Sequence, residues 1–120
     1  MKNHGLEKVT QELKVGDKIY NLVFDLNVMQ ELQEKYGSFD KWIELTDGEH
    51  GEVNIGALKF SFMSMINEGI DIENETAEKP KKILTEKQVG RLITEAGLMT
   101  STDALKKIVV KSTESDEKNV

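Results

Sequence analysis

The side chains that most often bind metals or carry out acid–base catalysis are scarce in this sequence. It contains two histidines, His4 and His50, and no cysteine. Without cysteine the chain forms no disulfide, zinc–thiolate site, iron–sulfur cluster or cysteine nucleophile. A two-histidine metal site would need both histidines together with carboxylates, but one lies near the N-terminus and the other in a glycine-rich turn. We therefore expect two solvated histidines and no metal site.

The segment 46–58, TDGEHGEVNIGAL, has a partial similarity to a calcium-binding loop. A calcium loop needs oxygen ligands at alternating positions before a glycine, and a bidentate acid at its last position. With Gly51 as that glycine, the first ligand positions hold Thr46, Gly48 and His50, and the last holds Ala57. Too few oxygen ligands remain, so we interpret the segment as an ordinary turn that contains glycine.

Carboxylates and serines are plentiful, but their surroundings do not favour catalysis. A general acid needs a pKa raised by burial or by a neighbouring charge. Six glutamates that could act as a general acid fall instead on predicted polar faces or in turns, namely Glu31, Glu34, Glu44, Glu49, Glu52 and Glu68. No Gly-x-Ser-x-Gly elbow or glycine-rich phosphate loop occurs, and the KPKK run at 79–82 lies beside glutamates in a solvated linker. We predict no enzyme activity, no catalytic residue and no cofactor.

The hydrophobic pattern predicts an N-terminal β-hairpin over residues 9–24. Apolar and polar residues alternate on both sides of Gly16, and this glycine can adopt the positive φ that a tight hairpin turn needs. Ile19 and Val23 fall on the second face of the hairpin, so we expect partial cover on both faces.

A helical period replaces the alternation after the hairpin, and it predicts four or five short helices. Side chains that can cap helix N-termini precede them, namely Asp25, Ser38, Asn54 and Thr85. Glycines that can end helices follow them, namely Gly37, Gly69 and Gly97. The last helix is expected to begin between residues 101 and 103. The predicted fold class is α+β and mainly α, with an N-terminal β-hairpin followed by four or five short helices.

A chain of 120 residues has room for one domain. We expect this domain over residues 9–110, after a flexible N-terminus at 1–8. The segment near 71–84 is charged and aperiodic and contains the only proline, so it is predicted to be a mobile loop. The polar segment 111–120 is predicted to be a disordered tail.

The net charge of −6 argues against a protein that coats nucleic acid, because phosphate contacts need clustered lysine and arginine. No apolar run is long enough for a signal peptide or a membrane span. We therefore expect a cytoplasmic protein without a membrane or nucleic-acid partner.

Four large apolar residues have no assured place in the predicted core. Phe60 lies off the apolar stripe of its helix, and Phe39 and Trp42 lie on a helix too short to hide every ring, while Met63 adds adaptable surface. Two interpretations remain open. Either these residues pack under the hairpin or the linker, or they form a partner-binding surface that accepts an amphipathic helix.

Three segments resemble the small tail assembly chaperones of long-tailed phages, of the siphovirus type, and of Gram-positive prophages. They are KVGDKIYNLVFDLNVMQELQEKYGSFDKWIEL, NIGALKFSFMSMINEGIDIE and LTEKQVGRLITEAG. The similarity covers roughly residues 14–98 and lies in the order and spacing of the segments, since no single motif is diagnostic.

The resemblance implies a non-enzymatic role in virion morphogenesis. Such chaperones bind the tape measure protein and keep it soluble while the tail tube assembles, so the implied partners are the tape measure protein and, secondarily, the tail tube protein. The protein would act in the cytoplasm of the bacterial host and be absent from the mature virion, with homo-oligomer formation left open. The alternatives are another phage morphogenesis protein, such as a head–tail connector, or a small helical DNA-binding regulator.

Overall fold

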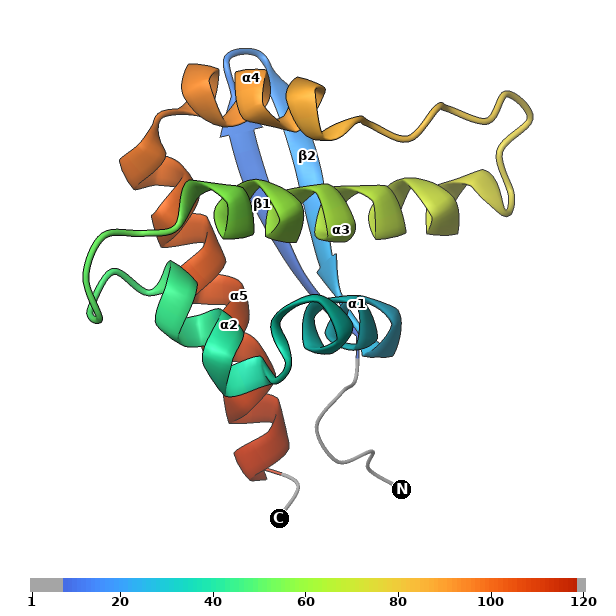
Figure 1. Cartoon of the computed structure of the whole chain (residues 1–120). Helices are drawn as coiled ribbons and strands as arrows, with labels where there is room; N and C mark the ends of the chain where they lie inside the picture. Colours follow the sequence, from blue (N-terminus) through green and yellow to red (C-terminus); the bar gives the residue numbers. More distant parts are fainter. Residues whose placement is uncertain (1–7, 119–120) are drawn as a thin grey trace.

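A computed structural model describes the backbone of residues 8–118 and the side chains of residues 8–113. Its elements in chain order are β1 (Val9–Val15), β2 (Lys18–Phe24), α1 (Leu26–Tyr36), α2 (Phe39–Thr46), α3 (Ile55–Asn74), α4 (Glu86–Ala96) and α5 (Leu98–Lys118). This order confirms the predicted class, a mainly helical α+β fold with an N-terminal hairpin (Figure 1). Of the four or five short helices predicted, the described chain has five, but α3 and α5 are long, with 20 and 21 residues. Of the N-terminus predicted to be flexible, residues 1–7 lie outside the described part of the chain.

β1 and β2 form the predicted antiparallel hairpin, with Val15 opposite Lys18 and a turn in which Gly16 has a φ of 61°. One face of the hairpin is buried, because the alternating pattern places its large apolar side chains on the same side, namely Leu13, Val15, Leu22 and Phe24. The other face is covered at Val23 but leaves Ile19 54% exposed. The second face of the hairpin, which was expected to be partly covered, is therefore buried near Val23 and exposed near Ile19.

α3 lies across the hairpin (Figure 1) and contacts β2 more extensively than any other helix does. At the closest approach a Cβ atom on Gly69 would lie 3.2 Å from Asn21 O and 3.3 Å from Val23 Cγ2. The absence of a side chain at Gly69 therefore allows helix and strand to touch. Gly69 does not end the helix as predicted, because α3 continues to Asn74.

The predicted loop at 71–84 consequently begins too early. Its first four residues belong to α3, and the connection to α4 spans 75–85. Two asparagines of α3 hold this connection: Asn74 exchanges hydrogen bonds with the backbone of Lys81, and Asn67 with the backbone of Leu84, at 2.8–2.9 Å. The connection is thus tied back to α3 at two points.

The four predicted N-caps are confirmed. Each capping side chain accepts a hydrogen bond from a backbone N–H in the first turn of its helix, and these caps are Asp25, Ser38, Asn54 and Thr85. Thr85 and Gln88 also form the complete capping box. Gly37 and Gly97 follow α1 and α4 with φ of 94° and 97°, as expected for glycines that end helices.

α5 departs from its predicted bounds at both ends. It begins at Leu98 rather than at 101–103, and it continues to Lys118, so the predicted disorder is wrong for residues 111–118. Extending a formed helix costs less than starting one, and Lys111 Nζ also donates hydrogen bonds to Thr10 O (2.9 Å) and Gln11 Oε1 (2.7 Å) of β1. Residues 119–120 lie outside the described part.

The hydrophobic core lies between the buried face of the hairpin and the inward sides of the helices. Every element contributes to it, and its largest fully buried side chains include Trp42, Phe24, Phe62, Leu32, Leu58, Val89 and Ile108. Because each helix packs one side into this core, the core determines which side of each helix faces solvent.

Candidate partner-binding surface

Trp42 belongs to the core. Its side chain is 0% exposed, its ring centroid lies 6.2 Å from that of Phe24, and its Nε1 donates a hydrogen bond to Ser61 Oγ at 2.6 Å. Of the two interpretations left open for Trp42, packing in the core is therefore the one that the structure supports, and its ring is not part of an exposed surface. The short helix α2 hides this ring because α3 supplies a polar partner for the indole N–H.

The other three predicted residues, Phe39, Phe60 and Met63, are half-buried and pack against the core. Phe39 lies against Trp42, with ring centroids 5.3 Å apart, whereas Phe60 makes an edge contact with Tyr36 of α1. The structure thus divides the predicted set between two neighbourhoods.

Phe60 is already covered by α1. Its ring centroid lies 6.0 Å from that of Tyr36, and Lys35 Nζ lies 4.8 Å above its face, a favourable position for a cation. Burial, followed by the charge of Glu86, raises the pKa of the Tyr36 hydroxyl above its ordinary value. This surface therefore offers a partner only part of each ring.

His50 lies exposed in the turn after α2, where its Nδ1 is 3.2 Å from an Asp47 carboxylate oxygen. The backbone N–H of Glu49 and then the His50 side chain lower the pKa of Asp47. Within residues 8–113 no group of three or more histidine or acidic side chains is arranged to hold a metal ion. His4 lies outside the described residues.

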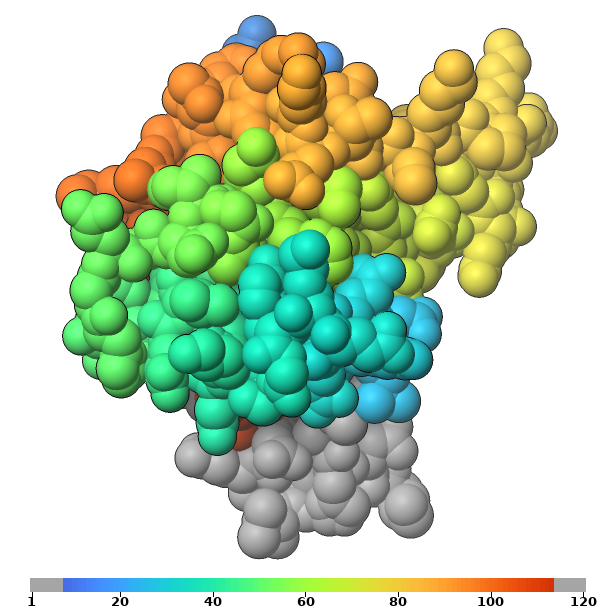
Figure 2. Space-filling view, viewed as in Figure 1, coloured from blue at the N-terminus to red at the C-terminus, as the bar shows by residue number. Residues whose placement is uncertain are grey.

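An open groove of about 740 Å³ lies between α3, α4 and the start of α5. Side chains of α3 and α4 meet along this part of the molecule in Figure 2. Its apolar lining consists of the buried Leu58 and Ile93 and the half-exposed Ile55 and Leu98. Beside Leu98, Met99 is 79% exposed, the highest value among the large apolar residues described as exposed. Two exposed apolar side chains, Ile55 and Leu98, therefore line the groove, while other exposed apolar residues of the described chain lie outside it.

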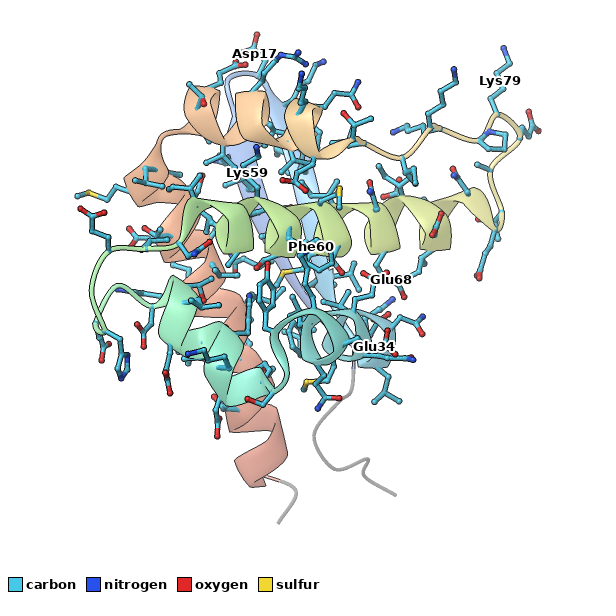
Figure 3. The ribbon with its side chains drawn as sticks, viewed as in Figure 1. Asp17, Glu34, Lys59, Phe60, Glu68 and Lys79 are labelled. Carbon is cyan, nitrogen blue, oxygen red and sulfur yellow. The ribbon has the colours of Figure 1, made fainter. Side chains whose placement is uncertain are left out.

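Three cations also line the groove, Lys59, Lys87 and Arg91, together with Thr94 and Gly90. Lys59 projects from α3 toward α4, on the side opposite to Phe60 (Figure 3). Its side chain crosses Gly90, where a Cβ atom would lie 3.1 Å from Lys59 Cε. The missing side chain at Gly90 therefore leaves room for the lysine within the groove.

The hydrophobic pattern of the sequence does not reveal this groove. Ile55 and Leu98 are the first residues of α3 and α5, and their exposure depends on how the ends of three helices meet. One signal was present in the sequence: Lys87 and Arg91, the only arginine of the chain, are four residues apart and share a face of α4.

No helix in the described part of the chain combines the length and hydropathy needed to cross a bilayer. Comparison with known proteins found no matching family model, curated protein or solved structure. A functional proposal therefore rests on the residues of this chain and their arrangement.

Proposed function

We propose that this protein is a non-enzymatic phage tail assembly chaperone that binds the tape measure protein and keeps it soluble while the tail tube assembles. The resemblance of three ordered segments to that family suggests the role. The observation that carries the proposal is the open apolar groove between α3 and α4 on a domain of net charge −6. The protein would act in the host cytoplasm and be left out of the finished virion.

The groove fits this role physically. A tape measure protein is a long helical protein that exposes apolar stripes before the tube surrounds it. An apolar groove can accept such a stripe, as in other helix-in-groove complexes, and Ile55 and Leu98 supply exposed apolar contacts in its lining. The acidic remainder of the surface would keep the complex soluble. The role requires no catalytic residue.

The test is co-expression with a helical fragment of the tape measure protein, followed by measurement of soluble fragment and of co-purification. Gly90→Leu adds a branched side chain to the groove lining, and we expect it to abolish both readouts. Gly90→Ala, which adds one methyl group, should leave both near the wild-type level. Circular dichroism confirms that each variant is folded.

Two further variants locate the surface that binds. Gln30→Leu adds the same side chain on the exposed face of α1 and should have no effect, whereas Phe60→Asp tests the surface predicted from sequence. Binding lost only with Phe60→Asp would move the site to that surface. Failure of every folded form to bind the fragment, or assembly of the protein into a defined ring by light scattering, would contradict the chaperone role.

A further inference from the structure

The charged side chains that line the α3–α4 groove are opposite in sign to the net charge of the whole chain. Three cations and no carboxylate line the groove, although acidic residues outnumber basic ones by six. Lys87 and Arg91 are exposed, and neither takes part in the two ion pairs described for residues 8–113, His50–Asp47 and Lys59–Glu86. Two positive side chains therefore stand beside the apolar lining without a bound carboxylate in that part of the chain.

The third cation is held weakly. Lys59 Nζ lies 3.8 Å from Glu86 Oε2, and the glutamate side chain is about half exposed. An ion pair at this distance near solvent contributes little to stability. A carboxylate from a bound partner can therefore replace Glu86 at modest cost.

We propose that the groove binds an amphipathic helix whose apolar stripe is flanked by aspartate or glutamate. The apolar lining receives the stripe, and Lys59, Lys87 and Arg91 receive the flanking carboxylates. Charge complementarity selects this occupant over an apolar helix with basic flanks, because like charges in apposition oppose binding. Since it assigns the chemistry of the partner, this inference rests on the proposed function and sharpens it.

The spacing of the cations restricts the pattern of the partner. Lys87 and Arg91 are one helical turn apart on α4, which separates their Cα atoms by about 6 Å along the axis. A partner helix lying along α4 matches this spacing with acidic residues four positions apart on one flank. The occupant therefore carries carboxylates at i and i+4 beside its apolar stripe.

The direct test uses three designed helical peptides of equal length with the same leucine stripe and with glutamate, glutamine or lysine on the flanks. Fluorescence anisotropy at low salt measures their binding to the full chain. We expect the glutamate peptide to bind at least about tenfold more tightly than the lysine peptide, and this preference should shrink as salt rises. Equal affinity for all three peptides would overturn the proposal.

Charge reversal supplies the matched comparison. The double substitution Lys87→Glu/Arg91→Glu should reverse the order of the glutamate and lysine peptides. Lys79→Glu/Lys82→Glu, in the connection between α3 and α4, changes the net charge equally and should preserve the wild-type order. An unchanged order in the groove variant refutes the role of the cations. A second outcome also overturns the proposal. If the protein binds duplex DNA rather than the peptides, and if this binding weakens with salt and is lost in Lys87→Glu/Arg91→Glu, the occupant of the groove is nucleic acid.

The tape measure fragment separates this inference from the proposed function. If the peptide preference holds and the fragment does not co-purify, the groove takes an acidic helix but the chaperone role fails. If the fragment co-purifies equally with wild type and Lys87→Glu/Arg91→Glu, yet not with Gly90→Leu, the chaperone role stands and the charge requirement fails.

Discussion

At the scale of single residues, a buried polar side chain explains why Trp42 lies in the core, a placement that the hydrophobic pattern leaves open. Ser61 lies fully buried on the apolar side of α3. It accepts the Trp42 indole N–H and donates to Ala57 O, both at 2.6 Å. A buried donor without a partner costs about 1–3 kcal/mol, so this serine allows the only tryptophan to occupy the core.

Glu68, which the sequence pattern placed among the solvated carboxylates, instead has surroundings that favour its neutral form. A hydrogen bond with the Asp25 side chain, followed by burial, raises the pKa of Glu68 above its ordinary value of 4.5, although the Asn27 amide, which donates at 2.9 Å, opposes this shift. Figure 3 shows Glu68 projecting from α3 toward α1. The native state therefore binds a proton at Glu68 more tightly than the unfolded chain does.

The first prediction concerns pH. Because the folded pKa is raised, the contribution of Glu68 to stability is complete below pH 4.5 and is lost as pH rises through the folded value. Glu68→Gln keeps a neutral side chain at every pH. The difference in unfolding free energy between this variant and wild type, measured with urea, should therefore grow in favour of the variant across that window and then level off.

Asp25→Asn provides the control for this prediction, because asparagine caps helices as well as aspartate does but removes the carboxylate partner. In that background the gain from Glu68→Gln should be smaller. A difference that stays constant with pH, or that favours wild type at high pH, would contradict the assignment.

At the scale of secondary structure, two glycines within helices have opposite surroundings. Gly69 in α3 touches the backbone of β2, since a Cβ atom there would lie 3.2 Å from Asn21 O, whereas Gly90 in α4 faces the flexible end of Lys59. Both positions lose helix propensity relative to alanine. At Gly69 the close contact with β2 offsets the lower helix propensity of glycine. At Gly90 the absence of a side chain leaves room for Lys59.

The second prediction compares the two positions. Gly69→Ala should destabilise the protein by about 1–3 kcal/mol, because the added methyl group would crowd the backbone of β2 and force strand and helix apart. Gly90→Ala should stabilise it by about 0.5–1 kcal/mol, because Lys59 can shift and helix propensity improves. Chemical unfolding of both variants measures the change in unfolding free energy. An equal change at the two sites would show that the contacts around each glycine do not determine the effect of the substitution.

At the scale of the whole molecule, α5 closes the domain by returning the chain to β1. Leu105 and Ile108 are buried in the common core, and Lys111 bonds to the backbone of Thr10, about a hundred positions away along the chain. The last helix therefore contributes to the core that the N-terminal hairpin begins.

The third prediction separates this core contribution from chain length. Deletion of residues 112–120 keeps every buried residue described for α5 and should preserve cooperative thermal unfolding by circular dichroism. Deletion of 105–120 also removes Leu105 and Ile108, each worth about 2–5 kcal/mol as a core side chain, against a total stability of about 5–15 kcal/mol. This shorter chain should be unfolded.

The full-length double variant Leu105→Ala/Ile108→Ala is the matched control. It should lower the midpoint of thermal unfolding strongly although no residue is deleted. Loss of folding after deletion of 112–120 alone would instead show that the last turns of α5 are essential.

The sequence by itself determined the local elements: the hairpin turn at Gly16, the capping box at Thr85 and the order of strands and helices. These features depend on backbone preferences and hydrogen bonds between residues close in the chain, so local patterns predict them. The tertiary structure decided that Gly69 is a contact point rather than a helix end, that Trp42 is buried, and that Ile55, Arg91 and Leu98 line one groove. Each of these outcomes depends on which distant surfaces meet, because burial and complementarity are properties of packed elements and not of any one segment.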